Sequence, residues 1–78
     1  MVVDGTYDPE VDAAYLRLIP TVEPGGSKRQ VVARTDGLAG ELVFDVDEDG
    51  RIIGIEVLSA TAVLRAETIA QLQRLGTP

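Results

Sequence analysis

Residues 41 to 58 contain the feature that most restricts the fold of this chain. Two stretches of alternating apolar and polar residues, Glu41 to Asp47 and Arg51 to Leu58, flank the dipeptide Asp49-Gly50. An Asp-Gly pair between alternating runs is a strong signal for a two-residue β-hairpin turn, because both central positions of that turn favour positive φ. The sequence therefore predicts two antiparallel strands joined at Asp49-Gly50.

A hairpin closed at this dipeptide also has a defined register. All six apolar side chains of the two strands then share one face, whereas a slip by one residue would scatter them over both faces. The agreement between turn chemistry and apolar pattern supports this pairing. The predicted pairs are Val46 with Ile53, Phe44 with Ile55, and Leu42 with Val57.

Three further strands and one helix complete the predicted fold. The strands are Val2 to Tyr7, Ala13 to Ile19 and Gln30 to Arg34. After Leu58 the apolar spacing becomes helical, and we expect a short turn over Ala60 to Leu64 and a helix over Ala66 to Leu75. It is left open whether the helix is continuous from Ala60 or broken near Arg65. The pattern predicts an α+β fold in a single domain, 1–78, with a small antiparallel sheet of about five strands and one C-terminal helix packed on one face.

The composition excludes several classes of function. The chain has no Cys and no His, which removes thiolate catalysis, the commonest zinc ligands and a Ser–His triad. Its net charge of −6 disfavours nucleic-acid binding. There is no apolar run of the roughly twenty residues that a membrane span needs, and no signal peptide at the N-terminus. We expect a cytoplasmic protein without a cofactor that binds neither nucleic acid nor membrane.

The acidic tip of the hairpin matches the spacing of a calcium-binding loop. Asp45 to Gly50 together with Glu56 fit the EF-hand pattern D-x-D-x-D-G-x₅-E. An EF-hand loop joins two helices, however, and this segment joins two predicted strands. On an extended strand Glu56 lies about 20 Å from the tip, so we interpret Asp49 and Gly50 as structural turn residues. Weak cation binding by the carboxylates stays open.

A second acidic segment joins the first two predicted strands. Asp8-Pro9 is typical of a cap residue followed by the first position of a turn, and Glu10 and Asp12 follow. In the structural interpretation Asp8, Pro9 and Asp12 form the turn, and the carboxylates of Glu10 and Asp12 are solvated. The alternative is a small-molecule or cation-binding enzyme that uses Asp8, Glu10 and Asp12. We favour the structural interpretation, because no nucleophile or electrophilic group accompanies these carboxylates.

The small size and the second face of the sheet both predict a protein partner. A chain of 78 residues buries only about 60% of its unfolded surface, and small chains without disulfides or metals often gain stability by oligomerising. The face opposite the helix keeps a surplus of apolar residues, and we take Val43, Ile52 and Leu58 as the candidate interface. We expect a non-enzymatic interaction module that forms a homodimer or binds another small protein.

Two blocks of the sequence resemble a known family. Tyr7 to Leu18 and Asp45 to Leu58 are similar to the small bacterial family called domain of unknown function 2283, and with the strand between them they cover most of the chain. The resemblance implies a short protein with a small antiparallel sheet and a terminal helix. It assigns no activity, cofactor or catalytic residue. Some members are encoded beside small toxin-like proteins, which implies an antitoxin-like role in masking a basic partner.

Overall fold

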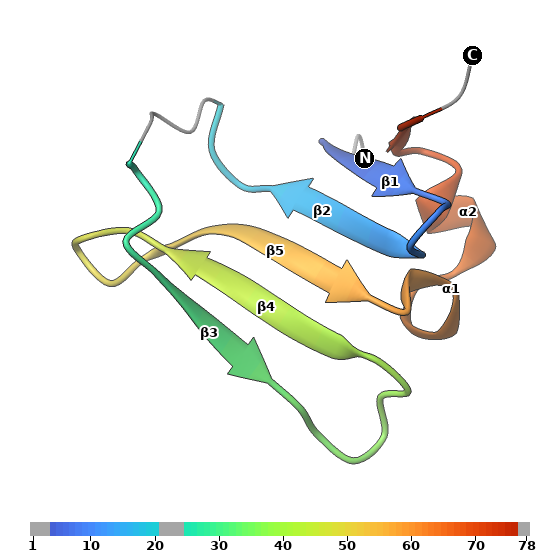
Figure 1. The fold of residues 1–78 in the computed structure, drawn as a ribbon, viewed down its shortest axis with the longest axis horizontal. Helices are drawn as coiled ribbons and strands as arrows, with labels where there is room; N and C mark the ends of the chain where they lie inside the picture. The colour runs from blue at the N-terminus through green and yellow to red at the C-terminus, as the bar shows by residue number, and fades with distance from the viewer. Residues whose placement is uncertain (1–3, 21–24, 77–78) are drawn as a thin grey trace.

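The computed structural model describes residues 4–20 and 25–76, which form one six-stranded sheet and two short helices (Figure 1). The strand order is β3-β4-β5-β2-β1-β6; the β1–β6 pair is parallel and the other pairs are antiparallel. The α+β class and the largely antiparallel sheet are therefore as predicted. The sheet has six strands instead of about five, and the C-terminal segment contains two short helices instead of one. The elements are β1 (Gly5–Asp8), β2 (Ala13–Arg17), β3 (Arg29–Ala33), β4 (Glu41–Val46), β5 (Ile52–Leu58), α1 (Ala60–Val63), α2 (Ala66–Ile69) and β6 (Gln73–Arg74).

The loop between β4 and β5 is one residue longer than predicted. The N–H of Asp47 donates to the carbonyl of Arg51 at 2.9 Å, so residues 48 to 50 form the loop. Only Gly50 of these has a positive φ, 78°, as expected for a three-residue hairpin loop that ends in a left-handed glycine. The Asp47 Oδ1 also accepts the N–H groups of Asp49 and Arg51 at 2.9 and 3.0 Å. These hydrogen bonds favour the longer loop over the predicted two-residue turn.

A β-bulge absorbs the extra loop residue. Val46 lies opposite Ile52 instead of the predicted Ile53, and the register shifts between Asp45 and Val46. Beyond the bulge the pairing returns to the predicted register, because only that register places the apolar side chains of both strands on one face. The core pairs are Phe44 with Ile55 and Leu42 with Val57.

The C-terminal segment is not the helix that the sequence predicted over Ala66 to Leu75. Helix α1 ends where Leu64 becomes extended (ψ 148°), and α2 ends at Ile69. Gln73–Arg74 then pairs with Thr6–Tyr7 as strand β6, and the N–H of Leu75 donates to the Tyr7 carbonyl at 2.8 Å. The backbone groups at this edge of β1 need partners, and a two-residue strand supplies them where a continued helix would not.

The other predicted strands differ from the observed ones only at their ends. Strand β2 ends at Arg17 instead of Ile19, and β3 lies one residue earlier than predicted. Strand β1 begins at Gly5; the predicted start at Val2 and Val3 lies outside the described residues.

Both helices belong to one face of the sheet, which we call the core face, and they lie at one end of it (Figure 1). The buried cluster at that end combines strand residues with residues of the helical segment. We call this end the covered half. Val57, with 1% of its surface exposed, is the largest fully buried side chain among the residues described. The cluster consists of Tyr7, Ala14, Val57, Ala60 and Leu72. Neither helix is long or apolar enough to span a membrane.

Candidate interaction surface

A row of four apolar side chains crosses the core face next to the covered half, and two of them, Leu16 and Ile55, pack against the buried cluster. The register pairs Leu16 of β2 with Ile55 of β5, Ile55 with Phe44 of β4, and Phe44 with Val31 of β3. Residues opposite one another in neighbouring strands point to the same face, so these four side chains are continuous. We call them the open row. Val31 at its end is 43% exposed, whereas Val57 in the neighbouring row is 1% exposed.

Strand β3 is the outermost strand on the side of the sheet far from the helices (Figure 1). Its outer edge pairs with no other strand in the part of the chain described. Val31 points to the core face and Val32, 54% exposed, to the opposite face, which we call the polar face. Natural proteins normally protect such an edge with charges, proline or a covering segment. The centre of β3 carries none of these protections.

The three residues that the sequence analysis proposed as the interface do not lie together. Val43 is buried on the polar face, beside Val32 of β3, and Leu58 is half-buried at the opposite end of β5 from the hairpin. Ile52 lies next to the hairpin loop and is 46% exposed. Because Ile52 is separated from the other two by most of β5, the three residues do not form one patch.

Sequence reasoning missed the open row because it assigned those residues to a core under a ten-residue helix. Phe44 and Ile55 were correctly placed on the face with the helix. The helices are too short to cover that face: each has four residues and extends only about 6 Å. Even the predicted ten-residue helix would extend only about 15 Å, which is less than the width of five strands at about 4.8 Å spacing. That comparison of lengths could have found the open row.

Asp12 joins the β1–β2 turn to helix α1. Its carboxylate accepts the Tyr7 hydroxyl at 2.8 Å, the Thr61 N–H at 3.1 Å and the Thr61 hydroxyl at 2.7 Å. Ser59, at the N-cap position of α1, makes no side-chain cap hydrogen bond, so Asp12 acts as the cap from a distant part of the chain. Asp12, predicted to be a solvated turn residue, is partly exposed, and its carboxylate is also hydrogen-bonded to Tyr7 and Thr61, which the sequence analysis did not foresee.

The titration behaviour of this network follows from its hydrogen bonds. The hydrogen bonds from Thr61, followed by that from Tyr7, hold the pKa of Asp12 below its usual value. The hydrogen bond to Asp12 in turn raises the pKa of Tyr7. Both shifts favour a charged Asp12 carboxylate with a neutral Tyr7 phenol.

A hollow of about 270 Å³ lies beside Tyr7 and Thr61. It is lined by Tyr7, Thr61, Leu64, Ala66, Ile69 and Arg74.

On the polar face, Tyr15 reaches across β5 to a carboxylate on β4. Its hydroxyl donates to Asp45 at 2.9 Å, and Gln30 of β3 donates to the other oxygen of Asp45 at 3.1 Å. The tyrosine ring passes directly over Gly54, where an added Cβ would overlap the hydroxyl. Partial burial, and then the hydrogen bond to Asp45, raise the pKa of Tyr15. Tyr15, Asp45 and Gln30 are therefore joined in one hydrogen-bonded group on this face.

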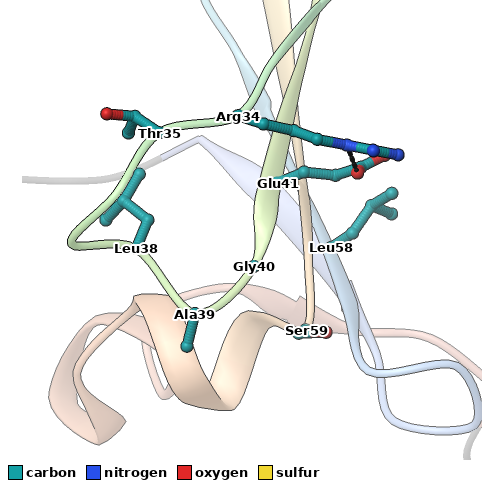
Figure 2. A pocket seen from close by; sticks show the side chains of 8 residues that line it. All are labelled: Arg34, Thr35, Leu38, Ala39, Gly40, Glu41, Leu58 and Ser59. Carbon is teal, nitrogen blue, oxygen red and sulfur yellow. Dashed lines mark hydrogen bonds and ion pairs between the residues drawn. The ribbon is translucent and has the colours of Figure 1, made fainter.

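A larger hollow, about 440 Å³, lies between the β3–β4 loop and the end of β5 (Figure 2). Figure 2 shows Arg34 and Glu41 side by side along its rim, with the guanidinium Nε 2.5 Å from the carboxylate. These are the two charged residues of its lining, and they neutralise each other. The other lining residues are Thr35, Leu38, Ala39, Gly40, Leu58 and Ser59. The hollow therefore offers a ligand little fixed charge.

The predicted turn residues lie at the two acidic loops. Asp8 accepts the N–H of Glu10 at 3.0 Å, and Pro9 lies between them in the β1–β2 turn. Asp49 is exposed at the tip of the β4–β5 hairpin. Over residues 4–20 and 25–76, no three acidic side chains lie in a group that could hold a metal ion. The carboxylates of the alternative enzyme hypothesis, Asp8, Glu10 and Asp12, therefore do not form such a group.

Comparison with known proteins identifies a family but no characterised relative. A family model described as protein of unknown function (DUF2283) matches residues 6–60. The matched range includes nearly all of β1, the strands β2 to β5 and the Asp12 network up to the start of α1. No curated protein and no solved structure matches the chain.

Proposed function

The chain belongs to the DUF2283 family of proteins of unknown function, and from its surface we propose that it is a non-enzymatic protein-interaction module that self-associates. The observation that carries this proposal is the open row on the core face together with the unpaired edge of β3. An apolar row that ends at an exposed, β-branched edge strand is a surface on which another protein can pair and pack.

The balance of surface and core supports self-association. The adjacent edge-strand residues Val31 and Val32 are 43% and 54% exposed, so the sheet keeps apolar surface that its own chain does not bury. The covered half provides a small core, and neither disulfides nor thiolate metal sites can supplement it in a chain without cysteine. Small domains of this kind commonly gain the missing stability from a partner subunit.

The roles of the polar side chains support a non-enzymatic function. Among residues 4–20 and 25–76, the residues with shifted pKa values are Tyr7, Asp12 and Tyr15, and each of them is hydrogen-bonded to another side chain of the fold. The shift of Asp12 stabilises its charge, and the shifts of the tyrosines stabilise their neutral forms. A general acid or base at neutral pH would need the opposite tuning, toward a pKa near the working pH.

The acidic charge favours a second role, the masking of a basic partner as in an antitoxin. The net charge is −6, and Glu48 and Asp49 are exposed at the hairpin tip. Such a field raises the association rate with a cationic surface. The test is co-purification with the product of the adjacent gene, followed by titration against salt. An affinity that falls with salt and is reduced in a Glu48→Lys/Asp49→Lys variant supports this role, and a complex insensitive to both argues against it.

Sedimentation equilibrium of the purified chain tests self-association directly. Over about a hundredfold range of protein concentration, we expect the mean mass to rise toward twice the 8.3 kDa of one chain. A mass that stays at one chain over the whole range contradicts the proposal.

A further inference from the structure

We propose that the partner at the edge of β3 is a second copy of this chain, joined by antiparallel β3–β3 pairing about a two-fold axis at Val32. This inference rests on the proposed self-association and specifies its surface and register. The result is one continuous sheet that runs through both copies.

The free edge of β3 is the edge that suits such pairing. Strand β3 has five residues, whereas β6 at the opposite edge of the sheet has two. A twofold pair of identical edges satisfies the outward backbone N–H and C=O groups of both copies with the same contacts. Figure 1 shows β3 along the outside of the sheet, on the side away from both helices.

The residue types in β3 favour an axis at Val32. In this register Val32 faces its own counterpart, and Val31 faces Ala33 of the second copy, so every apolar residue of the strand faces another apolar residue. An axis at Val31 would instead place Val32 opposite Gln30 and Ala33 opposite the charged Arg29. Cross-strand pairs of apolar residues stabilise a sheet, and mismatched pairs do not.

The charges that flank β3 favour the same register. With the axis at Val32, the start of β3 near Lys28 in one copy lies beside the β3–β4 turn that carries Asp36 in the other, and the two charges attract. With the axis at Val31, Lys28 would instead lie opposite Arg34, whose charge Glu41 already neutralises, and no attraction would result. Charge and apolar matching therefore favour the axis at Val32 over an axis at Val31.

The pairing also gives the open row a continuation. Val31 ends the open row of one copy, and Ala33 of the second copy begins its neighbouring row. By register that second row continues through three more apolar residues, Leu42, Val57 and Ala14. On the polar face, Val32 at the axis lies beside the buried Val43 in each copy. The core face is then apolar across the junction, and on the polar face the Val32 pair at the axis is flanked by Gln30 and Arg34.

Single cysteine substitutions test the register, because the chain has no cysteine of its own. In Val32→Cys the opposed Cα atoms are about 5.5 Å apart, within the roughly 4.4–6.8 Å that a disulfide spans. The matched control is Gln30→Cys, on the same exposed strand and the same face. Its two copies would lie about 13 Å apart along the strand. We expect Val32→Cys to form covalent dimers more than about tenfold faster under mild oxidation, and equal rates would overturn the register.

A pair of charge substitutions tests the surface without cross-linking. Val32→Glu places two carboxylates at the axis, and we expect it to raise the dimer dissociation constant by more than about tenfold. Leu18→Glu is the matched control, because Leu18 is 52% exposed and Val32 is 54% exposed. It lies outside the proposed junction and should leave the dimer intact. Circular dichroism of both variants verifies that the monomer fold is kept.

The outcomes separate this inference from the proposed function. If the wild-type chain dimerises but Val32→Glu has no effect, the edge pairing is wrong and self-association stands. If Leu18→Glu dissociates the dimer and Val32→Glu does not, the second copy lies on the core face instead. If the wild-type chain is monomeric at every concentration, both proposals fail.

Discussion

The two ends of the core face show how differently one apolar sheet can be used. In the covered half, residues of the helical segment bury Val57 and Ala14, and Asp12 fastens α1 to the β1–β2 turn. In the open half, Phe44 is half-buried, Val31 is 43% exposed, and the outer edge of β3 is unpaired within the described part of the chain, although Val46 and Ile53 near the hairpin loop are buried. The first region contributes the stability of the single chain, and we propose that the second contributes the contact between chains.

This comparison teaches that burial and alternation are separate properties of a strand. Along each strand, apolar residues alternate with polar ones through both the open row and the covered row beside it. Both rows pair in register across β2, β5 and β4. What separates them is the extent of two four-residue helices. Substitutions in the two halves should therefore affect different measurements: the Val32 variants above should change association, and the predictions below should change the stability of the single chain.

The largest effect is expected for Val57→Ala in the covered half. Val57 is 1% exposed, so the lost methyl groups and the cavity should lower the free energy of unfolding by about 2–3 kcal/mol. The same substitution at Val11, which is 68% exposed, should change it by less than about 0.5 kcal/mol. Urea unfolding at a fixed protein concentration measures both. Similar values for the two variants would mean that the helices do not form the stabilising core.

A smaller effect is expected for Gly54→Ala on the polar face. The added Cβ would overlap the Tyr15 side chain, which must move and lose its hydrogen bond to Asp45. We expect a loss of about 1–2 kcal/mol of stability. In a Tyr15→Val background the same substitution should cost much less, because no ring crosses the glycine. A double-mutant cycle without coupling between the two positions would be inconsistent with this arrangement.

Asp12→Ala should loosen the helices more than it destabilises the chain as a whole. The substitution removes the cap of α1 and the hydrogen-bond partner of Tyr7. The effect should be concentrated at the amides of α1, where hydrogen exchange should accelerate, and be small in β3 and β4. Asp12→Asn, which retains one carbonyl oxygen and tolerates the positive φ of this position, should have a weaker effect. Uniform acceleration over the whole sheet would contradict the local role.

The smallest effect is a dependence of stability on acid pH. Because the fold lowers the pKa of Asp12, the charged carboxylate stabilises the folded state fully above the unfolded-state value of about 3.9. That contribution is lost as the pH falls below the unfolded value and through the lowered folded value. Urea midpoints measured between neutral pH and pH 2 should fall less for Asp12→Asn than for the wild-type chain. Parallel curves would show that other carboxylates carry the acid dependence.

The central hairpin was the most predictable part of the fold, because its determinants are local. Alternating residues on both sides of Asp49-Gly50 defined the strands and the pairing of Phe44 with Ile55. The predicted length of the turn was wrong by one residue. An Asp-Gly pair suits both two- and three-residue loops, and the side chain of Asp47 decides between them by accepting two backbone N–H groups.

The C-terminal segment could not be predicted, because its conformation depends on residues far away in the sequence. Ile69, Leu72 and Leu75 have helical spacing, but the free edge of β1 competes for the backbone of Gln73–Arg74. Asp12 is a similar case. Nothing near Asp12 in the sequence indicates that Thr61, 49 residues later, will donate to it. Both contacts exist only once the sheet has brought the segments together.

The parallel pair of β1 and β6 has a consequence for the order of folding. It joins Thr6 to Gln73, so closing it fixes almost the full length of the chain as one loop, which is the slowest kind of contact to form. The local hairpin of β4 and β5 can form early, but β1 keeps a bare edge until Gln73–Arg74 has docked on it. A folding chain thus passes through a stage in which both margins of its sheet are available to neighbours.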